Sequence, residues 1–74
     1  MSSQIQSLIF DKTYYSKMSS GRWIRSHNFK PIKKVHETKT SWRYRLIEPD
    51  YNNFDYRIKI LTSGIKAIIQ IKKI

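Results

Sequence analysis

Polar and apolar residues alternate through the second half of the chain. Residues 41–47 place Trp42 and Tyr44 two positions apart, with Arg43 and Arg45 between and after them. Successive side chains of a strand leave opposite faces, so this spacing predicts a strand with one aromatic and one cationic face. The apolar face is expected to meet a hydrophobic core and the cationic face to meet solvent.

The same alternation recurs in residues 54–61, where Tyr56 and Ile58 alternate with Arg57 and Lys59. If the apolar residues of both strands face one core, their basic residues share the opposite face. The sequence therefore predicts a single cationic sheet face. Its expected members are Arg43, Arg45, Arg57, Lys59, Lys66 and Lys72, with Lys33 beside them.

Three other segments have strand-like composition. Residues 32–38 and 65–72 are rich in β-branched side chains, and residues 7–10 form a short apolar run. The pairs 39–40 and 63–64 separate predicted strands and are expected to form hairpin turns. Residues 65–72 could lie at the sheet edge and pair with the same segment of a second copy, but because they are apolar on both faces a central position is favoured.

One helix is expected before these strands. Ser16 is a suitable N-cap for residues 17–27, in which Trp23 and Ile24 share a face with Ser20 and His27. Asn28 is expected to end it. Gly21 costs about 1 kcal/mol relative to alanine, so this helix is expected to depend on docking against a sheet.

These elements predict an α+β domain over residues 7–74. One helix packs on a mainly antiparallel sheet of four to five strands, in the order β-α-β-β-β-β. Residues 1–6 are polar and are expected to be disordered before the domain.

Composition narrows the function classes. The chain has 74 residues, no cysteine and a formal net charge of +10, from 15 basic and 5 acidic residues. A chain this short has little room for a deep catalytic pocket, and without cysteine it has no disulfide or thiolate metal site. It has neither a segment long enough to span a bilayer nor a secretory pattern, so no membrane partner is expected.

The excess of positive charge points to an anionic partner, because it opposes compaction unless a polyanion neutralises it. The predicted sheet face suits phosphates, although a solvated face that keeps the protein soluble would have similar residues. A second group of cations belongs to the predicted helix and its flanks, where tracking a nucleic-acid backbone and simply facing solvent are both open. Its members are Lys12, Lys17, Arg22, Arg25 and Lys30.

Aromatic residues have two interpretations. In a chain this short Trp23, Trp42, Tyr44, Phe54 and Tyr56 are expected to build the core rather than stack on bases. The tyrosines at predicted element boundaries, which suit stacking better, are Tyr14, Tyr15 and Tyr51.

Catalytic and metal-binding patterns do not stand out in the sequence. His27 and His36 lie nine residues apart and lack the further ligands that a zinc site requires. Neither a nucleophile elbow nor a glycine-rich phosphate loop is present. No cofactor and no enzymatic activity are expected.

Short motifs along nearly the whole chain resemble a small domain found in tailed-phage head-gene products and giant DNA virus proteins. They are Phe10-Asp11-Lys12, Ser16, Trp23-Ile24, His27, Phe29-Lys30, Glu37-Thr38, Trp42-Arg43-Tyr44-Arg45, Pro49, Phe54, Arg57 and Gly64-Ile65-Lys66-Ala67-Ile68. The resemblance implies a viral setting, in the virion or inside an infected cell, and brings no established activity.

Two departures from that pattern stand out. Met18, Ser19 and Gly21 replace more typical helix residues, which weakens the expectation of a capping box from Ser16. Ile47, where the family usually has glutamine, precedes the acidic-proline pair.

Together these features predict a small basic nucleic-acid-binding protein that contacts phosphates with little sequence preference, in genome organisation or packaging. The expected contacts are Arg43, Arg45, Arg57, Lys59, Lys66, Arg22, Arg25 and Lys30. DNA is favoured over RNA, and a homodimer stays open. The alternative is an interaction module that docks on an acidic viral or host protein, which would need exposed apolar residues beside the arginines.

Overall fold

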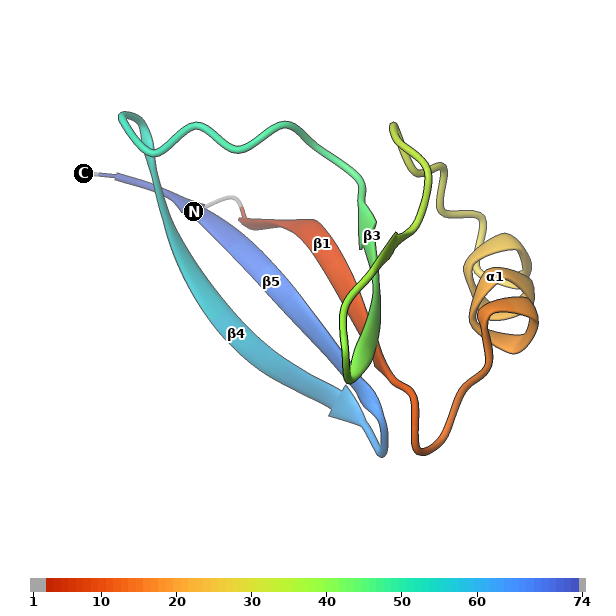
Figure 1. Ribbon diagram of the computed structural model, residues 1–74. Helices are drawn as coiled ribbons and strands as arrows, with labels where there is room; N and C mark the ends of the chain where they lie inside the picture. The colour runs from red at the N-terminus through yellow and green to blue at the C-terminus, as the bar shows by residue number, and fades with distance from the viewer. Residues whose placement is uncertain (1–2, 74) are drawn as a thin grey trace.

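The computed structural model describes residues 3–73 and shows one helix and a five-stranded antiparallel sheet, which confirms the predicted α+β fold (Figure 1). The elements are β1 (Ser3–Asp11), α1 (Lys17–Ser26), β2 (His36–Glu37), β3 (Ser41–Arg45), β4 (Phe54–Thr62) and β5 (Ile65–Lys72). Their order in the sheet is β2-β3-β1-β5-β4. The interior position expected for residues 65–72 is therefore confirmed.

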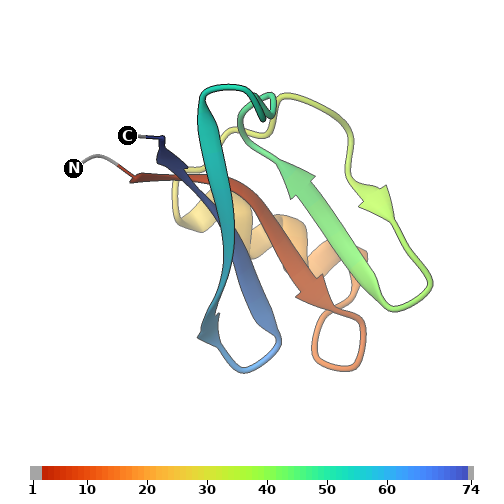
Figure 2. The same cartoon turned by 90° about the vertical axis from the view of Figure 1, so that its left-hand side faces the viewer.

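Helix α1 lies against one face of the sheet. Figure 2 looks onto the strands with the helix behind them, so the face toward the viewer is the one that α1 does not cover. We call it the open face and the other the helix side. The division matters because side chains on the two faces meet different surroundings.

Both ends of α1 are capped by side chains or loop geometry. The Ser19 backbone N–H donates to Ser16 Oγ at 3.1 Å, and the Ser16 N–H donates to Ser19 Oγ at 2.8 Å. This capping box forms with serine at its third helical position, so the expectation that Ser19 would weaken it was wrong. At the other end Asn28 has φ of +60° and ends the helix as predicted. Its N–H donates to the Arg25 carbonyl while that of Phe29 donates to the Ile24 carbonyl, a Schellman arrangement.

The core is a thin layer between α1 and the sheet. Phe10 is fully buried and meets the rings of Tyr15, Trp23 and Tyr44 edge to face, with centroids 5.1 to 5.5 Å apart. Leu8, Ile24, Ile65 and Ala67 complete the buried apolar set. Edge-to-face rings stabilise such a layer beyond the area they bury, by about 0.5–1.5 kcal/mol per pair.

Two segments differ from their predicted structure. Strand β1 begins at Ser3, so residues 3–6 belong to the sheet; residues 1–2 lie outside the described residues. Within the segment 32–38 only His36–Glu37 is a strand. Pro31 has no N–H to give, and after it the Ile32 N–H donates to the Arg45 carbonyl at the end of β3. The chain then bends while Val35 packs against the core.

A bulge in β1 holds the connection between β3 and β4. The ladder with β5 skips Gln6, which lies between Ile5 and Ser7. The freed Gln6 carbonyl accepts from the N–H groups of Leu46 and Ile47, and Gln6 Nε2 donates to the Ile47 carbonyl at 2.7 Å. Segment 46–53 is thereby guided across the sheet from β3 to β4 (Figure 1).

Candidate nucleic-acid interface

The register of β4 divides the predicted cationic face. Arg57 lies opposite Ile69, and Lys59 lies opposite Ala67, a buried core residue. Directly paired residues of neighbouring strands point to the same face. Arg57 and Lys59 therefore belong to the helix side, at the sheet edge, and the prediction that they share a face with Arg43 and Arg45 was wrong.

The physical reason lies in β5. Its odd-numbered residues fill the core, so the even-numbered residues of β4 pair with Lys66 and Ile68 on the open face. Ile58 and Ile60 are consequently each 70% exposed, although their alternation had suggested a place in the core. Alternation reveals that a strand has two different faces, and only the pairing register tells which face is covered.

Cross-strand rows give the open face a gradient in polarity. One row crosses the sheet from β4 to β2 through Ile60, Lys66, Ile9, Arg43 and His36. The next runs through Ile58, Ile68, Ser7 and Arg45. Isoleucines thus dominate the β4 end, and basic side chains dominate the β3 and β2 end.

A hollow of about 250 Å³ occupies the basic end. We call it the cationic hollow; its lining residues are Ser7, Lys33, Lys34, His36, Arg43 and Arg45. None of these lining residues is acidic, so the hollow concentrates positive charge where a phosphate oxygen can approach several donors together. The prediction of Arg43 and Arg45 on one exposed face is confirmed, with Lys33 beside them.

One carboxylate lies at the margin of this hollow. Glu48 is 3.3 Å from the Lys33 ammonium and 3.7 Å from the Arg45 guanidinium. All three side chains are well exposed, and exposed ion pairs of this kind contribute only about 0–1 kcal/mol. The ion pairs therefore orient Lys33 and Arg45, and a polyanion can still replace Glu48 as their partner.

A second hollow adjoins the first. This tyrosine hollow is lined by Gln6, Ser7, Arg43, Arg45, Tyr51, Tyr56, Arg57, Ile58 and Ile68. The rings of Tyr51 and Tyr56 lie 5.0 Å apart between centroids, and Tyr51 is 70% exposed. Tyr51, expected as a stacking candidate, is therefore accessible to solvent. Tyr56 was predicted to lie in the core, but it lines this hollow instead.

Polar contacts fix the loop that carries Tyr51. The Asp50 carboxylate accepts from Asn53 Nδ2 at 2.8 Å and from the Asn52 N–H. The Asn53 side-chain bond is the main cause that holds the pKa of Asp50 below its usual value. Lys73, which follows β5, donates from its Nζ to the Tyr51 carbonyl at 2.9 Å. Tyr51 is thus presented by an anchored turn.

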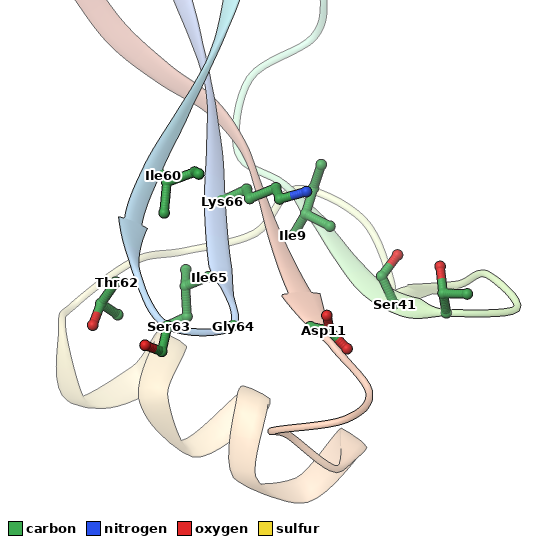
Figure 3. A pocket seen from close by; sticks show the side chains of 10 residues that line it. Ile9, Asp11, Ser41, Ile60, Thr62, Ser63, Gly64, Ile65 and Lys66 are labelled. Atoms are coloured by element: carbon green, nitrogen blue, oxygen red, sulfur yellow. The ribbon is translucent and has the colours of Figure 1, made fainter.

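A third hollow of about 290 Å³ lies at the turn end of the β4–β5 hairpin (Figure 3). Lys66 extends across it toward Ile9, while Asp11 lies at its other side. The Asp11 carboxylate accepts from the Thr13 N–H at 2.8 Å, which is the main cause that lowers its pKa, and Lys66 adds a smaller contribution. Lys66 is therefore on the predicted face but apart from the cationic hollow.

The helix cations lie elsewhere. Arg22 and Arg25 project from α1, which covers the opposite face, and Lys30 follows the helix; none of the three lines a hollow described above. Lys12 is committed to Glu37 and to the Trp42 ring, whose centroid lies 4.6 Å from its ammonium. The structure thus brings Arg43 and Arg45 together in both hollows, and Arg57 joins them only in the lining of the tyrosine hollow. Lys59, Lys66 and the helix cations line neither of these two hollows.

Two residues of the cationic hollow were missed as phosphate contacts. They are Lys34 and His36, neither of which is among the contacts expected from the sequence. The adjacent Lys33 and Lys34 after Pro31 were a signal for this site. Where proline interrupts a strand, consecutive side chains can reach the same face of the sheet. His36 could be placed only from its pairing with Arg43.

Within residues 3–73, no cluster of three or more histidine, cysteine, aspartate or glutamate side chains is arranged to hold a metal ion. In the same range, no helix combines the length and apolar character needed to cross a bilayer. No family model matches the chain, and no curated protein or solved structure is detectably similar to it.

Proposed function

We propose that this protein binds nucleic acid through the open face and contacts phosphates with little preference for sequence. The observation that carries the proposal is the cationic hollow, where Arg43 and Arg45 meet Lys33, Lys34 and His36. Guanidinium and ammonium groups gathered this way displace condensed counterions from phosphates. A role in genome organisation or packaging within a viral setting rests on the short motifs alone.

The proposal concerns binding and not catalysis. The open face offers cations and apolar side chains, which suit binding of a polyanion. Backbone recognition requires only charge and shape. Low sequence preference follows because contacts to phosphates carry no sequence information.

Salt dependence tests the proposal. Four phosphate contacts, from Lys33, Lys34, Arg43 and Arg45, predict a slope of log K against log salt of about −4 on duplex and about −3 on single strands. Replacing both arginines by glutamate should make the slope shallower by about 2 and weaken binding in 0.1 M salt by about 25- to 60-fold. Fluorescence anisotropy titrations at several salt concentrations measure both quantities.

The matched control is Lys17→Glu with Arg22→Glu, which changes net charge equally on the exposed helix. This pair should leave the slope close to that of the wild type, since α1 lies on the other face. Equal losses from the two double variants would show that net charge alone drives binding, and a slope near zero for the wild type would end the proposal.

The open face also favours a second candidate, an interaction module for an acidic viral or host protein. Trp42 and Tyr44 do not support it, because they are half-buried and buried on the helix side. The exposed Ile58 and Ile60, however, supply apolar area on the same face, at its β4 end. Docking of an acidic protein would bury these isoleucines and would become weaker on Ile58→Ser with Ile60→Ser.

A further inference from the structure

The cationic hollow and the tyrosine hollow share a wall. Ser7, Arg43 and Arg45 line both, so the basic and the aromatic surfaces are continuous. A ligand that fills them together must carry negative charge and flat apolar groups a short distance apart. Arginine suits such a wall because its planar guanidinium both binds phosphate oxygens and stacks on rings.

The aromatic side of this wall is already in place. The Tyr56 hydroxyl accepts from the Asp50 N–H at 2.6 Å and donates to Gln70 Oε1 at 3.3 Å. Gln70 in turn donates to Gln4 Oε1, which ties the ring to the sheet. Tyr51 leans against this fixed ring and stays 70% exposed. A base that stacks here meets a preorganised surface, which keeps the entropic cost of binding low.

The chemistry of the two hollows distinguishes among nucleic acids. In a duplex the faces of the bases are stacked inside, so only phosphates, sugars and groove edges reach a protein. In a single strand the phosphates and the base faces are both accessible, and aromatic side chains beside cations bind them together.

Building on the proposed function, we infer that the ligand is a single-stranded nucleic acid that crosses the open face. Its phosphates occupy the cationic hollow, and a base stacks on Tyr51 with Ile58 beneath it. The strand runs over the wall formed by Arg43 and Arg45. The ribose plays no part in this arrangement, so DNA and RNA strands bind similarly.

Charge argues against a second copy of the chain as the occupant. Two open faces brought together would place Arg43, Arg45 and Lys34 against their own copies, in a protein whose net charge is +10. An acidic protein would neutralise the cations, but it need not present a flat ring to stack on the exposed face of Tyr51. The experiment must therefore distinguish an acidic protein from a single-stranded nucleic acid.

The experiment compares labelled oligothymidylate and oligouridylate of about 12 nucleotides with a duplex carrying the same number of phosphates and with polyglutamate of equal charge. At physiological salt the single strands should bind at least about five-fold more tightly than either competitor. Tyr51→Ala should weaken single-strand binding about five-fold or more, while Tyr51→Phe keeps it and duplex binding stays unchanged.

Tyr14→Ala is the matched control, because Tyr14 is 64% exposed and lines neither hollow. It should leave single-strand binding unchanged. Equal binding of duplex and single strands with no effect of Tyr51→Ala would overturn the inference and leave the proposed function standing. Binding of polyglutamate as tight as that of oligothymidylate would overturn both, as would no binding of any nucleic acid.

Discussion

At the scale of single residues, one buried hydroxyl pair joins the helix to the sheet. Ser20 Oγ lies 2.7 Å from the Tyr44 hydroxyl and donates to the Lys17 carbonyl. Ser20 is fully buried and Tyr44 is 7% exposed. The tyrosine hydroxyl therefore has to donate to Ser20, and water cannot easily replace that partner.

A double-mutant cycle measures this contact. Ser20→Ala should destabilise the protein by about 1–3 kcal/mol, because it leaves the Tyr44 hydroxyl buried without a partner. Adding Tyr44→Phe should recover part of that loss, since both polar groups are then gone. Urea unfolding followed by tryptophan fluorescence gives the free energies. Strictly additive changes would show that the two hydroxyls do not interact.

At the scale of elements, two glycines should respond to alanine in opposite directions. Gly64 turns the β4–β5 hairpin with φ of +82°, and an added Cβ would lie 2.8 Å from Tyr14 Cβ. Gly21 lies inside α1, where an added Cβ would have ordinary contacts, 3.4 Å to Arg25 Nη1 and 3.6 Å to Tyr44 Oη.

We expect Gly64→Ala to destabilise the protein by about 1–3 kcal/mol, through both strain and collision. Gly21→Ala should stabilise it by about 0.5–1 kcal/mol, because alanine loses less backbone entropy in a helix. Midpoints of urea unfolding compare the two variants directly. If both substitutions changed the free energy of unfolding in the same direction, the geometry described at Gly21 or at Gly64 would be wrong.

The sequence was sufficient to predict elements whose signal is local. The helix start at Ser16, its end at Asn28, the 63–64 turn and the bounds of β5 all follow from capping, turn chemistry and periodicity. The face of β4 could not be obtained in this way. It depends on which residue of β5 lies opposite Ile58, and that register is fixed by long-range pairing.

The candidate site was predictable to the same extent. Arg43 and Arg45 alternate with core residues of their own strand, so their exposure followed from local pattern. The tyrosine hollow did not follow, because Tyr51 reaches Tyr56 only through the loop that the Gln6 bulge and Asp50 hold in place. Contacts built by loops across a sheet leave little trace in alternation.

At the scale of the whole molecule, positive charge is present on both sides but organised on one. The helix side carries Arg22, Arg25, Arg57 and Lys59 as exposed side chains on α1 and the β4 edge. The open face gathers its cations in a hollow beside exposed aromatic and apolar side chains. We therefore expect the open face to bind nucleic acid and the helix side not to bind it.

Amide chemical shifts during titration with oligothymidylate test that claim most directly, because they report every part of the backbone in one experiment. We expect changes concentrated at residues 33–36, 43–45, 51 and 56–58, with the amide shifts of α1 unchanged. Changes concentrated on α1, or spread evenly over both faces, would contradict it.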